Sequence, residues 1–230
     1  MSERIVQDQA ENCSNLFTYI ADEVIDYLEG TLLAVGQDVL PSSEGLRSRE
    51  HENALRFLDL NQRCLNLIAI ADSQPGDLQK VGLIMRAAME LEQVNDLISR
   101  IIDLRAGIGQ ELIDSFGFNS IGNLTILLGI RSLDAFITNE AKAFNDILVI
   151  ECELEDMHRQ VRENAMILMQ TSLYSLGEVL ASRSLSWHLE RIASHLSDIS
   201  KCSTMALSDA FSTGVVGIGP IPQMTGFSKN

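Results

Sequence analysis

Apolar residues recur every three or four positions along most of this chain, which is the period of an α-helix with one buried face. The clearest run covers about residues 78–104. Its apolar positions are Val81, Ile84, Met85, Ala88, Leu91, Val94, Ile98 and Ile101. Alternating patterns typical of strands are almost absent. The pattern therefore predicts an all-α protein.

Six helices are expected, covering about residues 12–35, 46–71, 78–104, 119–143, 143–168 and 176–211. In the second of them, Leu55, Leu58, Leu65 and Ile68 form the predicted apolar face. Glycines near residues 105–118 divide the six into two sets of three, and long helices joined by short turns favour up-and-down bundles. We expect a first three-helix unit over 1–107, a second over 108–212, and an irregular tail over 213–230.

The two expected units share a repeated segment. Leu78, Glu92 and Ile101 of the first unit reappear as Leu176, Glu190 and Ile199, at a constant offset of 98 residues. A repeat of this size predicts two similar structural units related by internal duplication.

Composition narrows the class of function. Hydrophobic residues are 46% of the chain and charged residues 21%, enough for a substantial core. The net charge of −15 argues against nucleic-acid binding, which needs a basic surface, and favours basic protein surfaces or cations as partners.

Compartment can also be predicted from the sequence. The chain has four cysteines, at Cys13, Cys64, Cys152 and Cys202. Because no two of them form a CxxC pair, we expect reduced thiols in the core rather than disulfides or a zinc site. The N-terminus lacks a signal pattern, and no apolar run approaches the roughly 20 residues that span a bilayer. We expect a cytoplasmic protein without direct membrane insertion.

Acidic residues in the repeat are the first candidates for chemistry. Glu92 and Asp96 stand four residues apart, so their carboxylates lie on one helix face. A hard cation between them would relieve their repulsion; a solvated acidic surface is the alternative interpretation. The second copy has Glu190 but puts Ser194 in place of the second acid.

A second candidate is the Glu-x-x-His element formed by Glu155 and His158, a spacing found in di-iron helical bundles. Such sites need two elements of this kind, and the sequence offers one good copy. A ferritin-like oxidase is therefore an open but weaker alternative. The sequence suggests no nucleophilic triad and no obvious general acid or base, so we expect a protein that is not an enzyme.

The repeated segment resembles the PhoU family, in which tandem three-helix units each carry a Glu-Arg-Ile-x-Asp-His motif or a relative of it. Glu190-Arg-Ile-Ala-Ser194-His195 is similar to that motif, and Glu92-Gln-Val-Asn-Asp96 to its first copy. The segment from Glu151 to His158 resembles a further family stretch. The resemblance covers about residues 12–212.

The resemblance implies a cytoplasmic regulator that contacts the ATPase of a phosphate ABC transporter and a sensor histidine kinase. Some family members hold multinuclear metal clusters on the repeated acids, which implies divalent or iron-type metal ions at Glu92, Asp96, Glu155 and Glu190 in this chain. In the second helix, the family's acids are replaced at Phe57, Asn61 and Gln62.

Our leading hypothesis is a non-enzymatic regulator of phosphate transport and signalling, with homodimer formation expected from its wide apolar stripes. The alternatives are a PhoU-like regulator of another ion transporter and, more distantly, the ferritin-like oxidoreductase.

Overall fold

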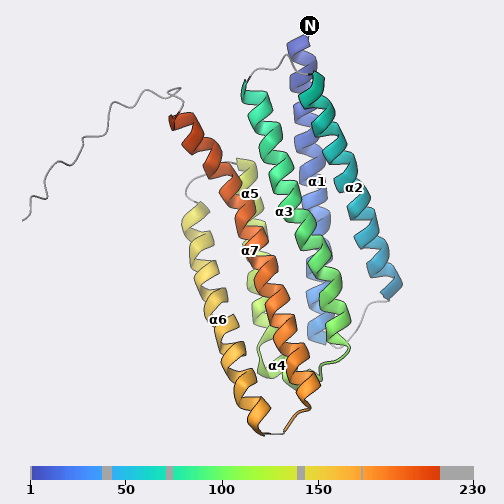
Figure 1. The fold of residues 1–230 in the computed structure, drawn as a ribbon, viewed down its shortest axis with the longest axis vertical. Helices are drawn as coiled ribbons and strands as arrows, with labels where there is room; N and C mark the ends of the chain where they lie inside the picture. The colour runs from blue at the N-terminus through green and yellow to red at the C-terminus, as the bar shows by residue number, and fades with distance from the viewer. Residues whose placement is uncertain (1, 38–42, 71–74, 139–142, 172, 213–230) are drawn as a thin grey trace, which may run out of the picture.

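The protein is an elongated bundle of long α-helices (Figure 1). The computed structural model describes residues 2–37, 43–70, 75–138, 143–171 and 173–212. Within these ranges it contains seven helices and no strand, which confirms the all-α prediction. The helices are α1 (Ser2–Gln37), α2 (Ser43–Ile70), α3 (Pro75–Arg105), α4 (Gln110–Ser115), α5 (Phe118–Thr138), α6 (Ala143–Thr171) and α7 (Leu176–Ser212). The predicted tail at 213–230 lies outside the described residues.

Helices α3 and α7, which carry the two copies of the repeat, lie side by side in the middle of the bundle. Helices α1 and α2 pack against α3, and α5 and α6 pack against α7. Helix α1 also packs against α5, so one continuous hydrophobic core runs through both halves. The division at residues 107 and 108 therefore stays a prediction.

The connection between the halves is held by a buried arginine at the end of α3. Arg105 is 3% exposed; its Nε donates to the Val35 carbonyl at 2.9 Å, and one terminal nitrogen donates to the Ile108 carbonyl. The short helix α4, which the sequence did not predict, follows. Gly117 then turns the chain into α5 with φ +67°, a conformation that favours glycine.

Helix α2 buries a different face from the predicted one. Leu55, Leu58, Leu65 and Ile68 are all exposed. The buried positions lie on the opposite side of the helix and are Asn53, Phe57, Leu60, Cys64 and Leu67. Both sets recur at three- and four-residue spacing, so periodicity alone could not decide which one faces the core. The predicted face of this helix was wrong.

Helix α5 corrects a second expectation, because by length and composition it is apolar enough to cross a bilayer. In this bundle it serves as a core helix between α1, α6 and α7. Its packing is close at Gly129, where a Cβ atom would lie 2.7 Å from Ile25 Cδ1 and 3.2 Å from Leu196 Cδ1. In the bundle, 44% of this apolar window is buried.

All four cysteines are free. Cys13, Cys64 and Cys202 are buried, as predicted, and burial raises the pKa of the Cys64 thiol to about 12. Cys152 on α6 is exposed, so its assignment to the core was wrong.

Candidate functional site

The acidic pair of the first repeat lies on one side of α3. Glu92 is half-buried and Asp96, one turn later, is exposed. Burial and the neighbouring Asp96 charge both raise the pKa of Glu92 above its usual value. Both effects disfavour the charged form of Glu92, and the effect of Asp96 has the direction expected for two carboxylates one turn apart.

Helix α2 has no acid at Phe57, Asn61 or Gln62, the three positions where the resemblance noted above implies one. Phe57 is fully buried in the core, and Asn61 is half-buried. The Gln62 amide is exposed and donates to Asn66 Oδ1 at 2.9 Å. Glu92 and Asp96 thus gain no carboxylate at these positions of the neighbouring helix.

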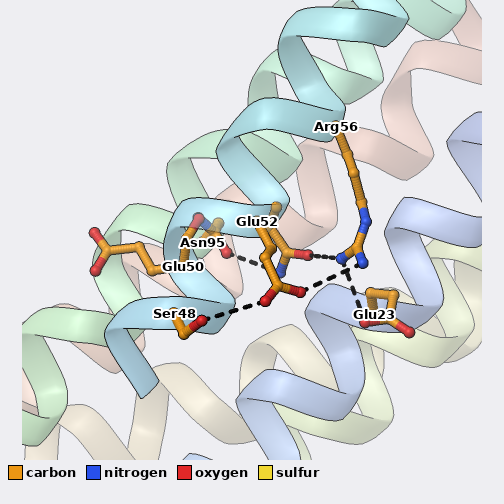
Figure 2. Close-up of polar contacts among 7 residues, drawn as sticks. Glu23, Ser48, Glu50, Glu52, Arg56 and Asn95 are labelled. Carbon is orange, nitrogen blue, oxygen red and sulfur yellow. Dashed lines mark hydrogen bonds and ion pairs between the residues drawn. The ribbon is translucent and has the colours of Figure 1, made fainter. Parts of the chain in front are cut away.

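Instead, the residue beside Asp96 takes part in a polar network between α1, α2 and α3 (Figure 2). Asn95 is fully buried; its Oδ1 accepts from Asn53 Nδ2 at 3.1 Å, and its Nδ2 donates to the Glu50 carbonyl at 3.3 Å. Asn53 Oδ1 in turn accepts from Arg56 at 2.8 Å. The two buried amides have their polar atoms satisfied by each other and by α2.

Arg56 links this network to two carboxylates (Figure 2). Its terminal nitrogens lie 3.5 Å from Glu23 on α1 and 3.6 Å from Glu52, one turn earlier on α2. Its guanidinium also lies over the ring of Tyr19, 5.3 Å from the ring centroid. A positive side chain therefore joins α1 to α2, and its partner Asn53 is in turn bonded to Asn95 on α3.

In the second unit, the repeated glutamate is paired with an arginine. One terminal nitrogen of Arg162 on α6 lies 3.1 Å and 3.2 Å from the two carboxylate oxygens of Glu190 on α7. The ion pair is only partly exposed. Ser194, at the position of the second acid, is exposed and adds no charge. The charge of Glu190 is therefore balanced by a side chain of the protein itself.

The Glu-x-x-His element does not form a pair of ligands. Glu155 is exposed, whereas His158 is 1% exposed and lies in the core between α6 and α7. His158 Nδ1 forms a 2.9 Å hydrogen bond with Ser186 Oγ, and Nε2 has no partner within the described residues. Burial lowers the pKa of His158 to about 4, with a smaller opposing effect from Glu190. The histidine of this element therefore joins α6 to α7.

A contact between α3 and α7 was missed in the sequence. His195 Nδ1 lies 2.8 Å from Glu90 Oε2, and its Nε2 lies 3.5 Å from Arg191. Arg191 also covers the ring of Trp187 at 5.2 Å from the centroid. The sequence did carry a signal, since Glu90 and His195 lie on the two repeat helices, but their side-by-side placement is a tertiary feature.

The donor set fits a multinuclear metal cluster poorly. Across the ranges that the structure describes, no group of three or more histidine, cysteine, aspartate or glutamate side chains is placed to hold a metal ion. Glu190 faces a cation of the protein, and Glu92 and Asp96 receive no acid from Phe57, Asn61 or Gln62. A single cation on Glu92 and Asp96 remains a prediction, as do the ligand roles of Glu155 and Glu190.

Three comparisons bear on the origin of this arrangement. Residues 118–203 match the family described as PhoU domain. A curated relative from Burkholderia sp, the phosphate-specific transport system accessory protein PhoU homolog, is 21% identical over 169 residues, covering 71% of this chain and 72% of the relative. The second half of this chain therefore matches the PhoU domain.

Solved PhoU structures share the fold over nearly the whole chain. The crystal structure of PhoU from Pseudomonas aeruginosa gives a TM-score of 0.79 at 14% identity, covering 88% of this chain and 99% of that one. The phosphate transport system regulatory protein PhoU from Streptococcus pneumoniae gives 0.77 at 18% identity, covering 93% and 100%. The PhoU fold therefore extends through both halves, although the family match itself lies in the second.

Proposed function

We propose that this PhoU-like chain is a non-enzymatic cytoplasmic regulator of phosphate uptake and phosphate-responsive signalling. It acts by docking to the ATPase of a phosphate ABC transporter and to a sensor histidine kinase. The observation that carries the proposal is the match of residues 118–203 to the PhoU domain, supported by the similarity to a curated relative whose name describes a phosphate-specific transport accessory protein.

The use of polar side chains in the bundle supports docking rather than chemistry. His158 is bonded to Ser186 inside the core, and Arg162 is paired with Glu190 across α6 and α7. Both pairs join neighbouring helices, so these groups serve the shape of the bundle. A rigid surface of fixed shape is what a docking regulator presents to its partner.

The acidic helices of this chain favour a partner whose docking surface is basic. Helix α1 carries seven acidic residues and one arginine, and α6 carries six acidic residues and two arginines. Such surfaces speed association with a basic partner, and the effect weakens as salt screens the charges. We expect binding that is tighter at low ionic strength than at high ionic strength.

A binding assay with purified partners tests the proposal. The full chain should bind the transporter ATPase and the kinase from the same organism, with an affinity that changes with phosphate concentration. An unrelated ABC-transporter ATPase serves as the control and should not bind. Absence of binding to both partners at every phosphate level would contradict the proposal.

A second candidate is regulation of a different ion transporter by the same kind of docking. Departures from the family motif favour it, because Ser194 replaces an acid and Gln93 replaces an arginine. Binding to the ATPase or channel of another ion system, with no binding to the phosphate system, would establish this candidate instead.

A further inference from the structure

Two of the four cysteines meet across the contact between α1 and α2. Cys13 on α1 is 2% exposed, and Cys64 on α2 is fully buried. A hydrogen bond joins the two thiols, so their sulfur atoms are neighbours in the core. Two adjacent thiols can form a disulfide with each other, a reaction that a single buried thiol does not have.

The packing of α1 against α2 brings the two cysteines to the same level independently of that hydrogen bond. Arg56 on α2 lies 3.5 Å from Glu23 and covers the ring of Tyr19, both on α1. The two helices run antiparallel (Figure 1). Cys64 comes about two turns after Arg56, and Cys13 comes about two turns before Tyr19, so equal shifts along the two helices bring Cys13 opposite Cys64.

An open cleft of about 360 Å³ leads to one of these thiols. Its lining comes from the first half of α1 and the last turns of α2: Gln9, Asn12, Cys13, Arg63, Asn66 and Ile70. Because most of these side chains are polar, the cleft admits water and polar molecules of similar size. Cys13 lines the cleft and Cys64 does not, so a small oxidant reaches Cys13 first.

The surroundings of the two thiols suit different roles in such a reaction. The guanidinium of Arg63, which is also paired with Asp59 at 2.9 Å, lies close enough to Cys13 for their charges to interact. A nearby cation favours the thiolate, the form that attacks an oxidant. Burial, and then the neighbouring Cys13, raises the pKa of Cys64 to about 12, so Cys64 stays a thiol at neutral pH.

We propose that Cys13 and Cys64 form a reversible intramolecular disulfide when hydrogen peroxide enters the cleft. The Cys13 thiolate attacks one peroxide oxygen, the O–O bond breaks, and the leaving hydroxide takes up a proton to become water. Cys13 is now a sulfenic acid. The sulfur of Cys64 then displaces the remaining oxygen, which leaves with the Cys64 proton as a second water while the S–S bond forms.

In total, two thiols and one peroxide give one disulfide and two waters, and a dithiol reductant reverses the change. The bond ties α1 to α2. The proposal does not depend on the proposed role in phosphate transport.

Mass spectrometry of the oxidised protein tests the thiol pair. Cys152 is exposed, so Cys152→Ser first removes the competing thiol. In that background, the folded chain treated with dilute hydrogen peroxide should lose about 2 Da and yield a cross-linked peptide joining Cys13 to Cys64, and dithiothreitol should restore the starting mass. The matched control Cys202→Ser, at a buried position on α7, should form the same disulfide. Absence of the Cys13–Cys64 peptide from the peroxide-treated folded chain would overturn the proposal.

Two further variants separate the roles of the groups in the same Cys152→Ser background. Cys64→Ala removes the second thiol, so the sulfenic acid of Cys13 should accumulate and be labelled by dimedone. Arg63→Gln should slow disulfide formation by about threefold or more, whereas Arg47→Gln, exposed on the same helix, should keep the original rate. Circular dichroism confirms that each variant is folded. A folded Cys64→Ala chain that dimedone does not label at Cys13 would contradict attack by this thiol.

Discussion

Arg162 on α6 donates to both carboxylate oxygens of Glu190 on α7, at 3.1 Å and 3.2 Å. Glu190 corresponds by the 98-residue repeat to Glu92, whose neighbour Asp96 is a second carboxylate. The same glutamate therefore has a cation beside it in one unit and an anion in the other. The two repeat positions thus lie on the neighbouring helices α3 and α7 but have different electrostatic surroundings.

The ion pair should contribute modestly to stability, since both groups are about one-third exposed. We expect Arg162→Gln to lower the free energy of unfolding by about 0.5–1 kcal/mol, measured by urea denaturation. Arg159→Gln is the matched control, because within the part of the chain that the structure describes Arg159 pairs with Asp156 and Glu163 of its own helix. Equal losses in the two variants would argue against a role for Arg162 in joining α6 to α7.

Buried His158 should make the protein sensitive to acid. Its folded pKa of about 4 lies below the ordinary value of 6.5, so the folded state favours the neutral ring. The neutral ring therefore contributes fully to the free energy of unfolding above pH 6.5. As the pH falls from 6.5 towards 4 this contribution is lost, and the loss reaches about 3 kcal/mol.

His158→Gln keeps a hydrogen-bonding group near Ser186 but does not titrate. Its free energy of unfolding should fall less steeply than that of the wild type between pH 7 and pH 4. His51→Gln, at an exposed position on α2, should keep the wild-type slope. The account of His158 fails if the wild type and His158→Gln show the same pH dependence.

The fold could be predicted from the sequence largely because most helices have one apolar face. The stripe of α3 was predicted correctly from Val81 to Ile101. The buried face of α2 was predicted wrongly because this helix has two apolar stripes. Which of the two is buried depends on the side that α1 and α3 cover. The short helix α4 has too few residues for a periodic signal.

The site was less predictable, because its contacts join residues far apart in sequence. The repeat identified Glu92 and Glu190 but not the arginine that Glu190 meets. His158 was noted for its spacing from Glu155, yet the structure buries one and exposes the other. Whether a polar group is buried, and which partner it meets, depends on how the helices pack against one another. The spacing of residues along one helix carries no information about that packing.

The buried amide pair between α2 and α3 should be costly to break from one side. Asn53→Leu removes the donor to Asn95 and the acceptor of Arg56, which leaves buried polar atoms unpaired. We expect a loss of about 1–3 kcal/mol in the free energy of unfolding. Asn66→Ala, an exposed change on the same helix, should stay within about 0.5 kcal/mol of the wild type.

The double variant Asn53→Leu/Asn95→Leu then tests the pairing. Because both amides are removed together, its loss should be smaller than the sum of the two single losses. Additive losses would show that the two amides do not stabilise each other.

Glu92 and Asp96 give a prediction with two separable readouts. Without metal, Asp96→Asn removes a charge that raises the pKa of Glu92, so that pKa should move towards its usual value in an NMR titration. Removing the repulsion should also raise the free energy of unfolding slightly at neutral pH.

If the pair holds a divalent cation, Asp96→Asn should also weaken binding of Mn²⁺ or Ca²⁺ in a calorimetric titration without unfolding the protein. Ser194→Asp restores the missing acid of the second copy, but Glu190 stays ion-paired with Arg162. We therefore expect this variant to bind the cation more weakly at Glu190 than the wild type binds it at Glu92 and Asp96. An identical titration for wild type and Asp96→Asn would rule out this pair as a metal site.

Phosphate uptake by intact cells tests the proposed function most directly. Cells lacking this chain should lose the normal decrease in uptake when phosphate is plentiful, and the full-length gene should restore it. Uptake of an unrelated ion should not change. Phosphate uptake that responds normally without the chain, at low and high external phosphate, would contradict a role in regulating phosphate transport.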